Sequence, residues 1–99
     1  MTENVTITYE DSDTKGRYVA TVAGVEGAGE LTLSKVSDAL VIADHTAVPD
    51  SMRGMGVARA LVEHLIAEAR AKGFRIVPLC PYVRAQSQKH PEWNDVIQH

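Results

Sequence analysis

The sequence contains a single cysteine, four prolines, one tryptophan and one phenylalanine, and it has no long apolar run. One cysteine excludes an intramolecular disulfide and provides no cysteine cluster for structural zinc. The most apolar stretch, residues 39–43, is far shorter than the roughly 20 residues of a membrane-spanning helix, so we expect no membrane partner. Residues 1–4 carry no basic or apolar leader, so we expect no signal peptide and a location in the reducing cytoplasm.

The length and composition indicate one compact domain that spans residues 1–99. A chain of 99 residues with 44 % hydrophobic side chains has room for a single core. A domain of this size buries roughly 60–68 % of the surface that its unfolded chain exposes. The core is therefore modest, and we do not expect a large enclosed cavity.

The charged side chains are divided unevenly along the chain. Residues 1–50 hold nine acidic and three basic side chains, a balance of −6, whereas residues 51–99 hold four acidic and seven basic ones, a balance of +3. One interpretation is two differently solvated faces. The other is a basic second half that meets an anion and an acidic first half that meets a cation. The net charge of −3 argues against nucleic acid as a partner, because binding to phosphates depends on basic residues.

The first half of the chain predicts a series of antiparallel strands. Val5, Ile7 and Tyr9 alternate with two threonines, which is typical of a strand with one buried face. Similar runs are separated by short loops rich in glycine, aspartate and serine, the pattern of consecutive hairpins. The predicted strands are residues 4–9, 17–22, 30–33 and 39–48, with turns at 11–16, 22–29 and 35–38.

In the second half the apolar spacing becomes that of a helix. Residues 53–72 are predicted to form a long helix, which ends at Lys72 and Gly73 with a cation and a left-handed cap. Its single apolar stripe consists of Val57, Ala58, Leu61, Val62, Leu65, Ile66 and Ala69. A fifth strand is predicted at residues 75–79, where Pro78 favours an edge or splayed position.

The remainder, residues 81–99, predicts a short helix, a break at Pro91 and a frayed tail. The order is thus four strands, a long helix, a fifth strand and a short helix. This order predicts an α+β fold in which a mostly antiparallel five-stranded sheet packs on one long helix, with a short C-terminal helix.

The segment that enters the long helix has the chemistry of an anion site. Gly54 and Gly56 have no Cβ, so a ligand can approach the backbone closely. The first amides of a helix have no internal acceptor, and the helix dipole adds positive potential there, so a phosphate or pyrophosphate fits. Arg53 can add a charged donor. Glycines alone are equally typical of a flexible turn before an ordinary helix.

Two other nucleotide-binding motifs do not fit this segment. A Walker loop requires Gly-Lys followed by Ser or Thr, which is absent. A Rossmann fingerprint requires a small residue three positions after Gly56, where Arg59 stands, and a parallel context that the preceding hairpins contradict.

The segment resembles the acetyl-CoA loop of GNAT-type N-acetyltransferases, Gln/Arg-x-x-Gly-x-Gly/Ala, with Arg53, Gly56 and Ala58 at the required positions. The chain is similar to a minimal subgroup of that superfamily. The elements of this subgroup are His-Thr-x-Val at residues 45–48, Pro-x-Cys-Pro-Tyr at 78–82 and Lys-His-Pro-Glu at 89–92. The similarity covers roughly residues 5–95.

The resemblance implies acetyl-CoA as the cofactor and an amine as the acceptor. It implies that the CoA pyrophosphate is held by backbone N–H groups of Arg53, Gly54, Met55, Gly56, Val57 and Ala58. It also implies that the end of the fourth strand near Val48 pairs with the pantetheine arm and polarises the thioester. The helices that usually follow the first strand and the usual final hairpin have no counterpart here, which implies an open acceptor site.

Cys80 and His45 are the candidate catalytic residues. In the subgroup that the chain resembles, both positions are regarded as such candidates. Cys80 follows the fifth strand and is either a nucleophile, an acid or base, or a small buried hydrophobic residue. His45 is either a general base or a histidine hydrogen-bonded in place. Alternation along the strand would put His45 on the same face as Ala43 and Ala47.

The other histidines are predicted to be structural. His90 is expected to pack with Trp93, His64 stands alone on the helix, and no spacing suggests a metal site. The leading hypothesis is an acetyl-CoA-dependent N-acetyltransferase acting on an amine, with a protein or peptide lysine among the candidates. The alternatives are a CoA-binding or partner-binding module with little turnover, and a small structural interaction protein.

Overall fold

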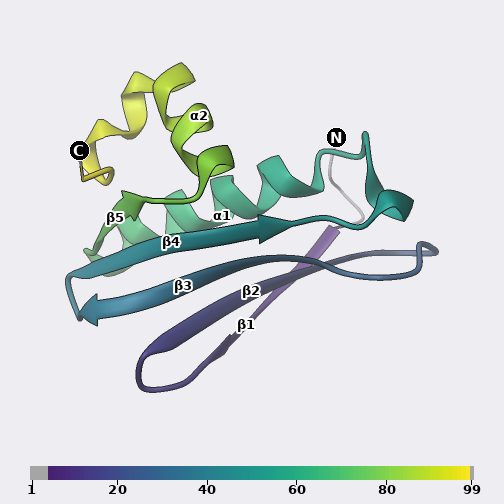
Figure 1. Cartoon of the computed structure of the whole chain (residues 1–99), viewed down its shortest axis with the longest axis horizontal. Coiled ribbons are helices and arrows are strands. Elements are labelled where there is room, and N and C mark those ends of the chain that lie inside the picture. The colour runs from purple at the N-terminus through teal and green to yellow at the C-terminus, as the bar shows by residue number, and fades with distance from the viewer. Residues whose placement is uncertain (1–4, 99) are drawn as a thin grey trace.

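A five-stranded sheet in the order β1-β2-β3-β4-β5 forms the centre of the computed structural model, which describes residues 5–98 (Figure 1). The first four strands are antiparallel neighbours, and the fifth runs parallel to β4. The strands are β1 (Val5–Asp11), β2 (Lys15–Val22), β3 (Gly29–Ser37), β4 (Leu40–Ala47) and β5 (Arg75–Pro78). The helices are α1 (Val57–Lys72) and α2 (Pro81–Lys89), with 3-10 turns η1 (Asp50–Met52) and η2 (Pro91–Asp95). The predicted α+β architecture is confirmed.

Helix α1 packs across β1, β2 and β3, and its apolar stripe forms one side of the core. The buried residues of α1 are Val57, Leu61, Val62, Leu65, Ile66 and Ala69, as the periodicity predicts, whereas Ala58 is only half-buried. Gly73 ends the helix in the left-handed conformation, and its N–H donates to the Ala69 carbonyl (2.9 Å). Burying each large aliphatic side chain contributes roughly 1.5–3 kcal/mol, so this stripe is a main source of stability.

The start of α1 differs from the prediction. The helix begins at Val57 and not at residue 53. Gly54 and Gly56 have φ angles of +78° and +74°, which lie in the left-handed region and cannot continue a right-handed helix. The apolar pattern does not show this, because it records which side chains are buried and not the backbone conformation.

The sheet has one covered face. The face that packs against α1, here called the inner face, carries buried side chains from β2, β3 and β4: Tyr18, Ala20, Leu31, Leu33, Val41 and Ala43. Val5, Ile7 and Tyr9 of β1 alternate onto the same face, as predicted, because Ile7 is paired with Ala20 and Tyr9 with Tyr18. Helices α1 and α2 leave the opposite face, here called the outer face, without a helical layer among the described residues (Figure 1).

Strand boundaries in the first half also differ from the prediction. β3 extends to Ser37, which pairs with Leu40, so the predicted turn over residues 35–38 shrinks to the two residues between them. β1 extends to Asp11, which pairs with Gly16 across a shorter turn than predicted. Residue 4, the predicted start of the first strand, lies outside the described residues.

The C-terminal segment is ordered against β5, and the predicted frayed tail is wrong for residues 91–98. Ile97 is completely buried and forms a parallel bridge with Ile76. The Ile76 N–H donates to the Val96 carbonyl and the Gln98 N–H donates to the Ile76 carbonyl, both at 2.7 Å. Val96 and Ile97 are too few apolar residues to show a period in the sequence, but they complete the edge of the sheet. Residue 99 lies outside the described residues.

An ion pair fastens this segment to α1. Arg70 donates from Nε to Oδ2 of Asp95 at 3.0 Å, and this hydrogen bond lowers the pKa of the Asp95 carboxyl below its ordinary value.

No helix within residues 5–98 has both the length and the apolar character that crossing a membrane requires.

Gly29→Val is expected to destabilise the protein by about 1–3 kcal/mol, because it overpacks the contact between β3 and α1. A Cβ at Gly29 would lie 2.9 Å from Val57 Cγ1 and 3.5 Å from Leu61 Cδ1. Urea unfolding measures the change. Thr21→Val, at an exposed position of β2, is the control and should stay within about 0.5 kcal/mol of the parent. Equal stability of Gly29→Val and the parent would contradict this packing.

Candidate functional site

Strands β4 and β5 part at the point where β5 ends. Their parallel pairing runs from Leu40 with Arg75 to Ala43 with Pro78. Proline has no N–H to continue a ladder, and the last link is the hydrogen bond from the Cys80 N–H to the Ala43 carbonyl (2.8 Å). In the described chain, the rest of β4 has no strand partner on this side. The edge of β4 from Asp44 to Ala47 is therefore unpaired beside the start of α2, where Pro78 predicted an edge or splayed position. The space beside this unpaired edge is here called the gap between β4 and α2.

A β-bulge lies in β4 at the mouth of this gap. Ala43 is opposite Leu33 and His45 is opposite Thr32, so Asp44 is an additional residue in β4. Directly paired residues of neighbouring strands point to the same face. Ala43 therefore faces the inner side with Leu33, whereas His45 faces the outer side with Thr32. Asp44 also lies on the outer face, because its Oδ2 accepts a hydrogen bond from Ser34, the neighbour of Leu33.

The prediction that His45 and Ala43 share a face is wrong. It assumed unbroken alternation, and a bulge shifts that alternation by one residue. Ala47, which is opposite Glu30, does lie on the same face as His45. The residue types of β4 give no signal for the bulge, because its position is set by the register against β3.

Cys80 lies on the inner side of the gap and is 3 % exposed. Its Sγ lies 3.4 Å from the hydroxyl oxygen of Thr46, which is paired with the buried Leu31. Cys80 also forms the N-cap of α2, with Pro81 at the first helical position. His45 and Cys80 are therefore on opposite faces of the sheet, and the structure does not bring them together as a hydrogen-bonded pair. Thr46, which joins the strand to the thiol, was not singled out from the sequence.

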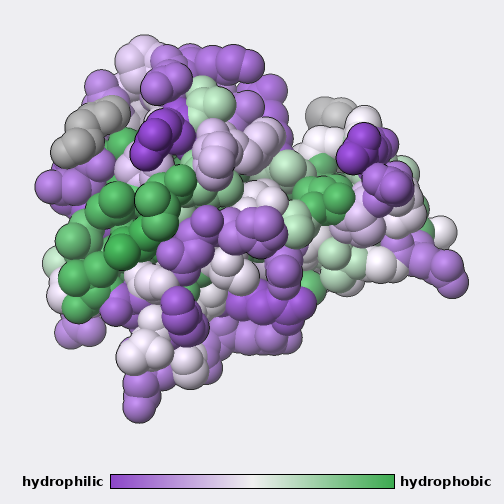
Figure 2. Space-filling model, in the orientation of Figure 1, coloured by the Kyte–Doolittle hydropathy of each residue, from purple (hydrophilic) through white to green (hydrophobic). Residues whose placement is uncertain are grey.

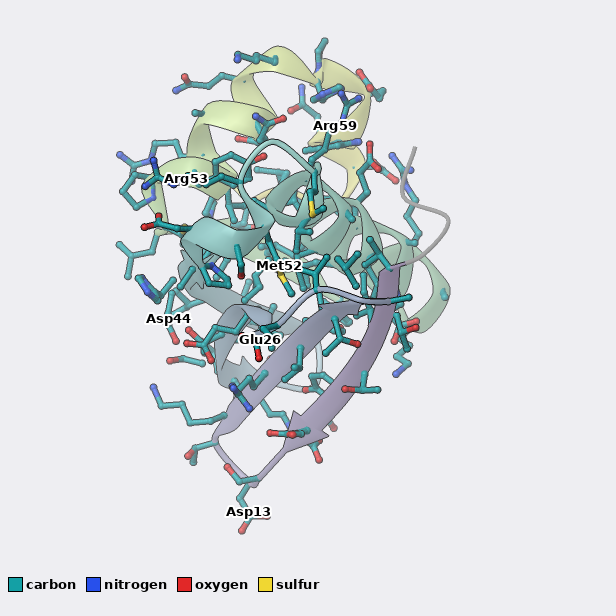
Figure 3. All side chains as sticks on the ribbon, turned by 90° about the vertical axis from the view of Figure 1, so that its right-hand side faces the viewer. Asp13, Glu26, Asp44, Met52, Arg53 and Arg59 are labelled. Carbon is teal, nitrogen blue, oxygen red and sulfur yellow. The ribbon has the colours of Figure 1, made fainter. Side chains whose placement is uncertain are left out.

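The loop between β4 and α1 is anchored to the rest of the protein by Met52 and Ser51, and the side that carries Arg53 is exposed. The Met52 side chain is buried (1 % exposed), and the Ser51 hydroxyl donates to the Glu26 carbonyl (2.7 Å). Arg53 extends outward and pairs with Asp50 at 3.0 Å, whereas Met52 points inward beneath α1 (Figure 3). These contacts hold the loop in place, and the side that carries Arg53 remains exposed to solvent.

Backbone N–H groups are free at the entry to α1. The Ala60 N–H donates to the Gly56 carbonyl (2.9 Å), so the N–H groups of Val57, Ala58 and Arg59 precede the first acceptor within the helix. No side chain of the described residues caps this end. A Cβ at Gly54 would have no atom within 4 Å, so there is open space beside the loop. Free donors, the positive end of the helix dipole and open space fit a phosphate group.

The remaining predicted residues of this site lie between β4 and α1 in the chain. Val48 continues from β4 and is half-buried against the core, and Met55 is 41 % exposed in the loop. A notch separates the mass that contains α2 from the lobe that contains the loop before α1 (Figure 2). In the chain, the unpaired edge of β4 continues directly into the loop that precedes the free N–H groups of α1.

The other histidines have structural surroundings. His90 stacks on Trp93 with ring centroids 4.3 Å apart, as predicted, and its Nδ1 lies 2.8 Å from Glu92. His64 contacts Tyr18 edge to face. Within residues 5–98, no three His, Cys, Asp or Glu side chains are grouped so that they could hold a metal ion.

Residues 17–96 match the family model of the GCN5-related N-acetyl-transferases. The chain belongs to this family. The match includes β2 from Arg17 onward, β3 to β5, both helices, the bulge and the loop before α1. The resemblance inferred from Arg53, Gly56 and Ala58 is therefore confirmed at the level of the family.

Two solved structures share the GCN5-related fold of this chain. A GCN5-like protein from Staphylococcus aureus, with a solution NMR structure, is 23 % identical and has a TM-score of 0.70 over 97 % of this chain and 90 % of its own. A GNAT family acetyltransferase from Elizabethkingia anophelis, crystallised with acetyl-CoA, is 15 % identical and has a TM-score of 0.61. It is matched over 75 % of this chain and 63 % of its own length. No curated protein matches the sequence significantly.

The cofactor predicted for this GCN5-related chain is the one that the Elizabethkingia structure contains. The chain spans less than two thirds of that protein, so it matches the common fold without the additional length.

Proposed function

We propose that the protein is an acetyl-CoA-dependent N-acetyltransferase that moves an acetyl group to an amine. The observation that carries this proposal is the unpaired edge of β4, which continues in the chain through a loop to a helix N-terminus that has no side-chain cap among residues 5–98. Membership of the GCN5-related family supports acetyl transfer as the reaction. These features support the proposal, because such a transfer needs an anion site, an unpaired strand edge and side chains that can move a proton.

The loop before α1 is proposed to hold the CoA pyrophosphate. Of the predicted donors, the backbone N–H groups of Gly54, Gly56, Val57 and Ala58 are proposed to bind it. The N–H groups of Arg53 and Met55 already donate to the Asp50 and Met52 carbonyls, both at 3.2 Å, which corrects the prediction for these two. Within residues 5–98, the Arg53 guanidinium is paired with the exposed Asp50, and exposed ion pairs contribute little, so Arg53 can turn to a phosphate. The unpaired edge of β4 down to Val48 can pair with the amide groups of the pantetheine arm, as a strand pairs with an added strand.

The acceptor amine must lose a proton before it can attack. With an ordinary pKa of about 10.4, a lysine amine is neutral in roughly one molecule in a few thousand at pH 7. His45 is exposed on the outer face at the bulge and is proposed to take this proton. When bound, acetyl-CoA supplies the thioester carbonyl that the amine attacks.

Cys80 is proposed to supply the second proton, on the inner side. The amine nitrogen forms a bond to the carbonyl carbon, the C–S bond breaks, and the CoA sulfur takes a proton from the Cys80 thiol. With 3 % of its surface exposed and its sulfur beside Thr46, Cys80 has a better position for proton donation than for nucleophilic attack. Thr46 is proposed to orient the thiol, and the proton that the amine nitrogen loses as it becomes an amide is proposed to return to the Cys80 sulfur.

The burial of Cys80 also favours the alternative, a CoA-binding module with little turnover. A buried thiol that makes a hydrogen bond to Thr46 can be a purely structural residue. The two functions differ in one measurable respect, which is the release of CoA thiol in the presence of an amine.

The test combines a binding and a turnover measurement. We expect CoA to raise the midpoint of thermal unfolding in a concentration-dependent way, because it binds only the folded state. We expect acetyl-CoA with a panel of polyamines, amino acids and basic peptides to release free thiol faster than without protein. A thermal shift without thiol release from any amine would favour the binding module. No thermal shift would contradict both functions.

A further inference from the structure

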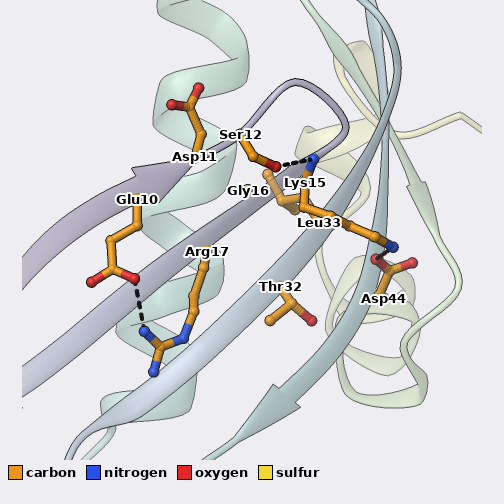
Figure 4. A pocket seen from close by; sticks show the side chains of 9 residues that line it. All are labelled: Glu10, Asp11, Ser12, Lys15, Gly16, Arg17, Thr32, Leu33 and Asp44. Atoms are coloured by element: carbon orange, nitrogen blue, oxygen red, sulfur yellow. Dashed lines mark hydrogen bonds and ion pairs between the residues drawn. The ribbon is translucent and has the colours of Figure 1, made fainter.

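The outer face of the sheet contains a hollow of about 530 Å³ between the β1–β2 hairpin and the bulge of β4 (Figure 4). It lies on the side of the sheet that has no helical layer within residues 5–98, so it is open to large molecules. The residues that line it are Glu10, Asp11, Ser12, Lys15, Gly16, Arg17, Thr32, Leu33 and Asp44. Neither the family match nor the loop before α1 accounts for this hollow.

A primary ammonium group already occupies one end of the hollow. The Lys15 Nζ donates to the Ser34 hydroxyl (2.7 Å) and lies 3.8 Å from Asp44 Oδ2. Ser34 in turn donates to the same Asp44 oxygen at 2.6 Å. The Lys15 side chain is 66 % exposed, and an exposed ion pair of this kind contributes little to stability. The Lys15 ammonium can therefore move away, and Asp44 and Ser34 are then available to bind another ammonium group.

The charges around the hollow favour a cation over an anion. The Arg17 guanidinium is bound on both sides by carboxylates, at 2.9 Å by Glu10 and at 2.5 Å by Glu30. Asp11 is paired with Lys35 at 2.6 Å. If Lys15 turned away, Asp44 would lose the cation that it is paired with in the described chain. An incoming ammonium restores the balance that Lys15 provides.

The hollow reaches the proposed site of transfer. Asp44 precedes His45 in β4, and the bulge puts both on the outer face. Thr32, which lines the hollow, is the direct partner of His45 across the strands. An amine that leaves the Asp44 carboxylate therefore meets His45 on the same face, at the mouth of the gap between β4 and β5.

We propose that this hollow is the acceptor site, and that its occupant is the lysine side chain of a flexible peptide segment whose ammonium replaces that of Lys15 on Asp44 and Ser34. This inference rests on the proposed function and names the substrate class for it. A lysine side chain is favoured because Asp44 and Ser34 already bind one. In addition, the open sheet face has room for the peptide on both sides of that lysine.

The kinetic test compares two aspartates. The acceptor is a capped Gly-Lys-Gly peptide, and the variants are Asp44→Asn and, as the control, Asp38→Asn, an exposed carboxylate outside the hollow. We expect Asp44→Asn to raise the KM for the peptide at least tenfold with the KM for acetyl-CoA unchanged, and Asp38→Asn to match the parent. We expect Lys15→Met to lower the KM for the peptide, because it removes the internal competitor. Equal kinetics of the two aspartate variants would overturn the proposed site.

A binding measurement separates this site from the reaction. Without acetyl-CoA, the lysine peptide is expected to shift the NMR amide signals of Lys15, Ser34 and Asp44, whereas the same peptide with norleucine in place of lysine leaves them unchanged. These shifts without any acetyl transfer would support the site and contradict the proposed function. Transfer to the peptide with no shift at these amides would support the function and overturn the site. Binding of spermidine but not of the peptide would overturn the peptide lysine as the occupant.

Discussion

Gly56→Glu is expected to weaken CoA binding at least 100-fold, a loss of roughly 2.8 kcal/mol. Gly56 has a φ of +74° and forms the N-cap of α1, so a glutamate there adds a side chain and a negative charge beside the free N–H groups. The charge repels the pyrophosphate and competes for the same donors. The left-handed conformation costs a non-glycine residue about 1–2 kcal/mol. Isothermal titration with CoA measures the loss.

The matched control is Gly73→Glu at the other end of α1. Gly73 has a φ of +81°, and a Cβ there would meet no atom within 4 Å. The same substitution therefore brings a similar backbone strain and the same charge, but far along the helix from the loop. We expect Gly73→Glu to lower stability and to bind CoA like the parent. If the two variants bind CoA equally well, the pyrophosphate does not lie at the entry of α1.

His45→Ala is expected to lower kcat by about 100- to 10,000-fold, the range for loss of a general base. CoA affinity should not change, because His45 lies on the outer face and away from the loop before α1. Single-turnover measurements with acetyl-CoA and an amine provide the test.

His64→Ala is the control for the loss of an imidazole, since His64 lies on α1 against Tyr18. It should keep the rate of the parent. Cys80→Ala tests the proposed proton donor on the inner face. It should lower kcat and leave CoA binding and the fold unchanged. If His45→Ala and Cys80→Ala both keep the full rate, neither residue takes part in the transfer.

Local patterns in the sequence were sufficient to predict the main elements. Alternation around Ile7 and the spacing from Leu61 to Ile66 depend on which side chains are buried, and burial follows directly from period 2 or period 3.6. The same patterns could not locate the start of α1, because two glycines with positive φ interrupt the backbone without changing the apolar stripe. The order of the tail against Ile76 was missed because it depends on a tertiary contact.

The site could be predicted only in part, for a similar reason. The free N–H groups before α1 follow from the positions of Gly54 and Gly56, which are local features. The relation between His45 and Cys80 depends on an extra residue in β4 and on the pairing with β3. The hollow depends on Lys15, Ser34 and Asp44, which come from three strands and share no local pattern.

The bulge also restricts how β4 can move. A strand that slides by one residue along its neighbour turns every side chain to the opposite face, so slippage is already costly for a strand with one buried side. The extra residue at Asp44 has no counterpart on β3 and adds a further obstacle. Fluctuations that widen or narrow the opening beside β4 should therefore come from Cys80 and α2, with β4 as the fixed wall.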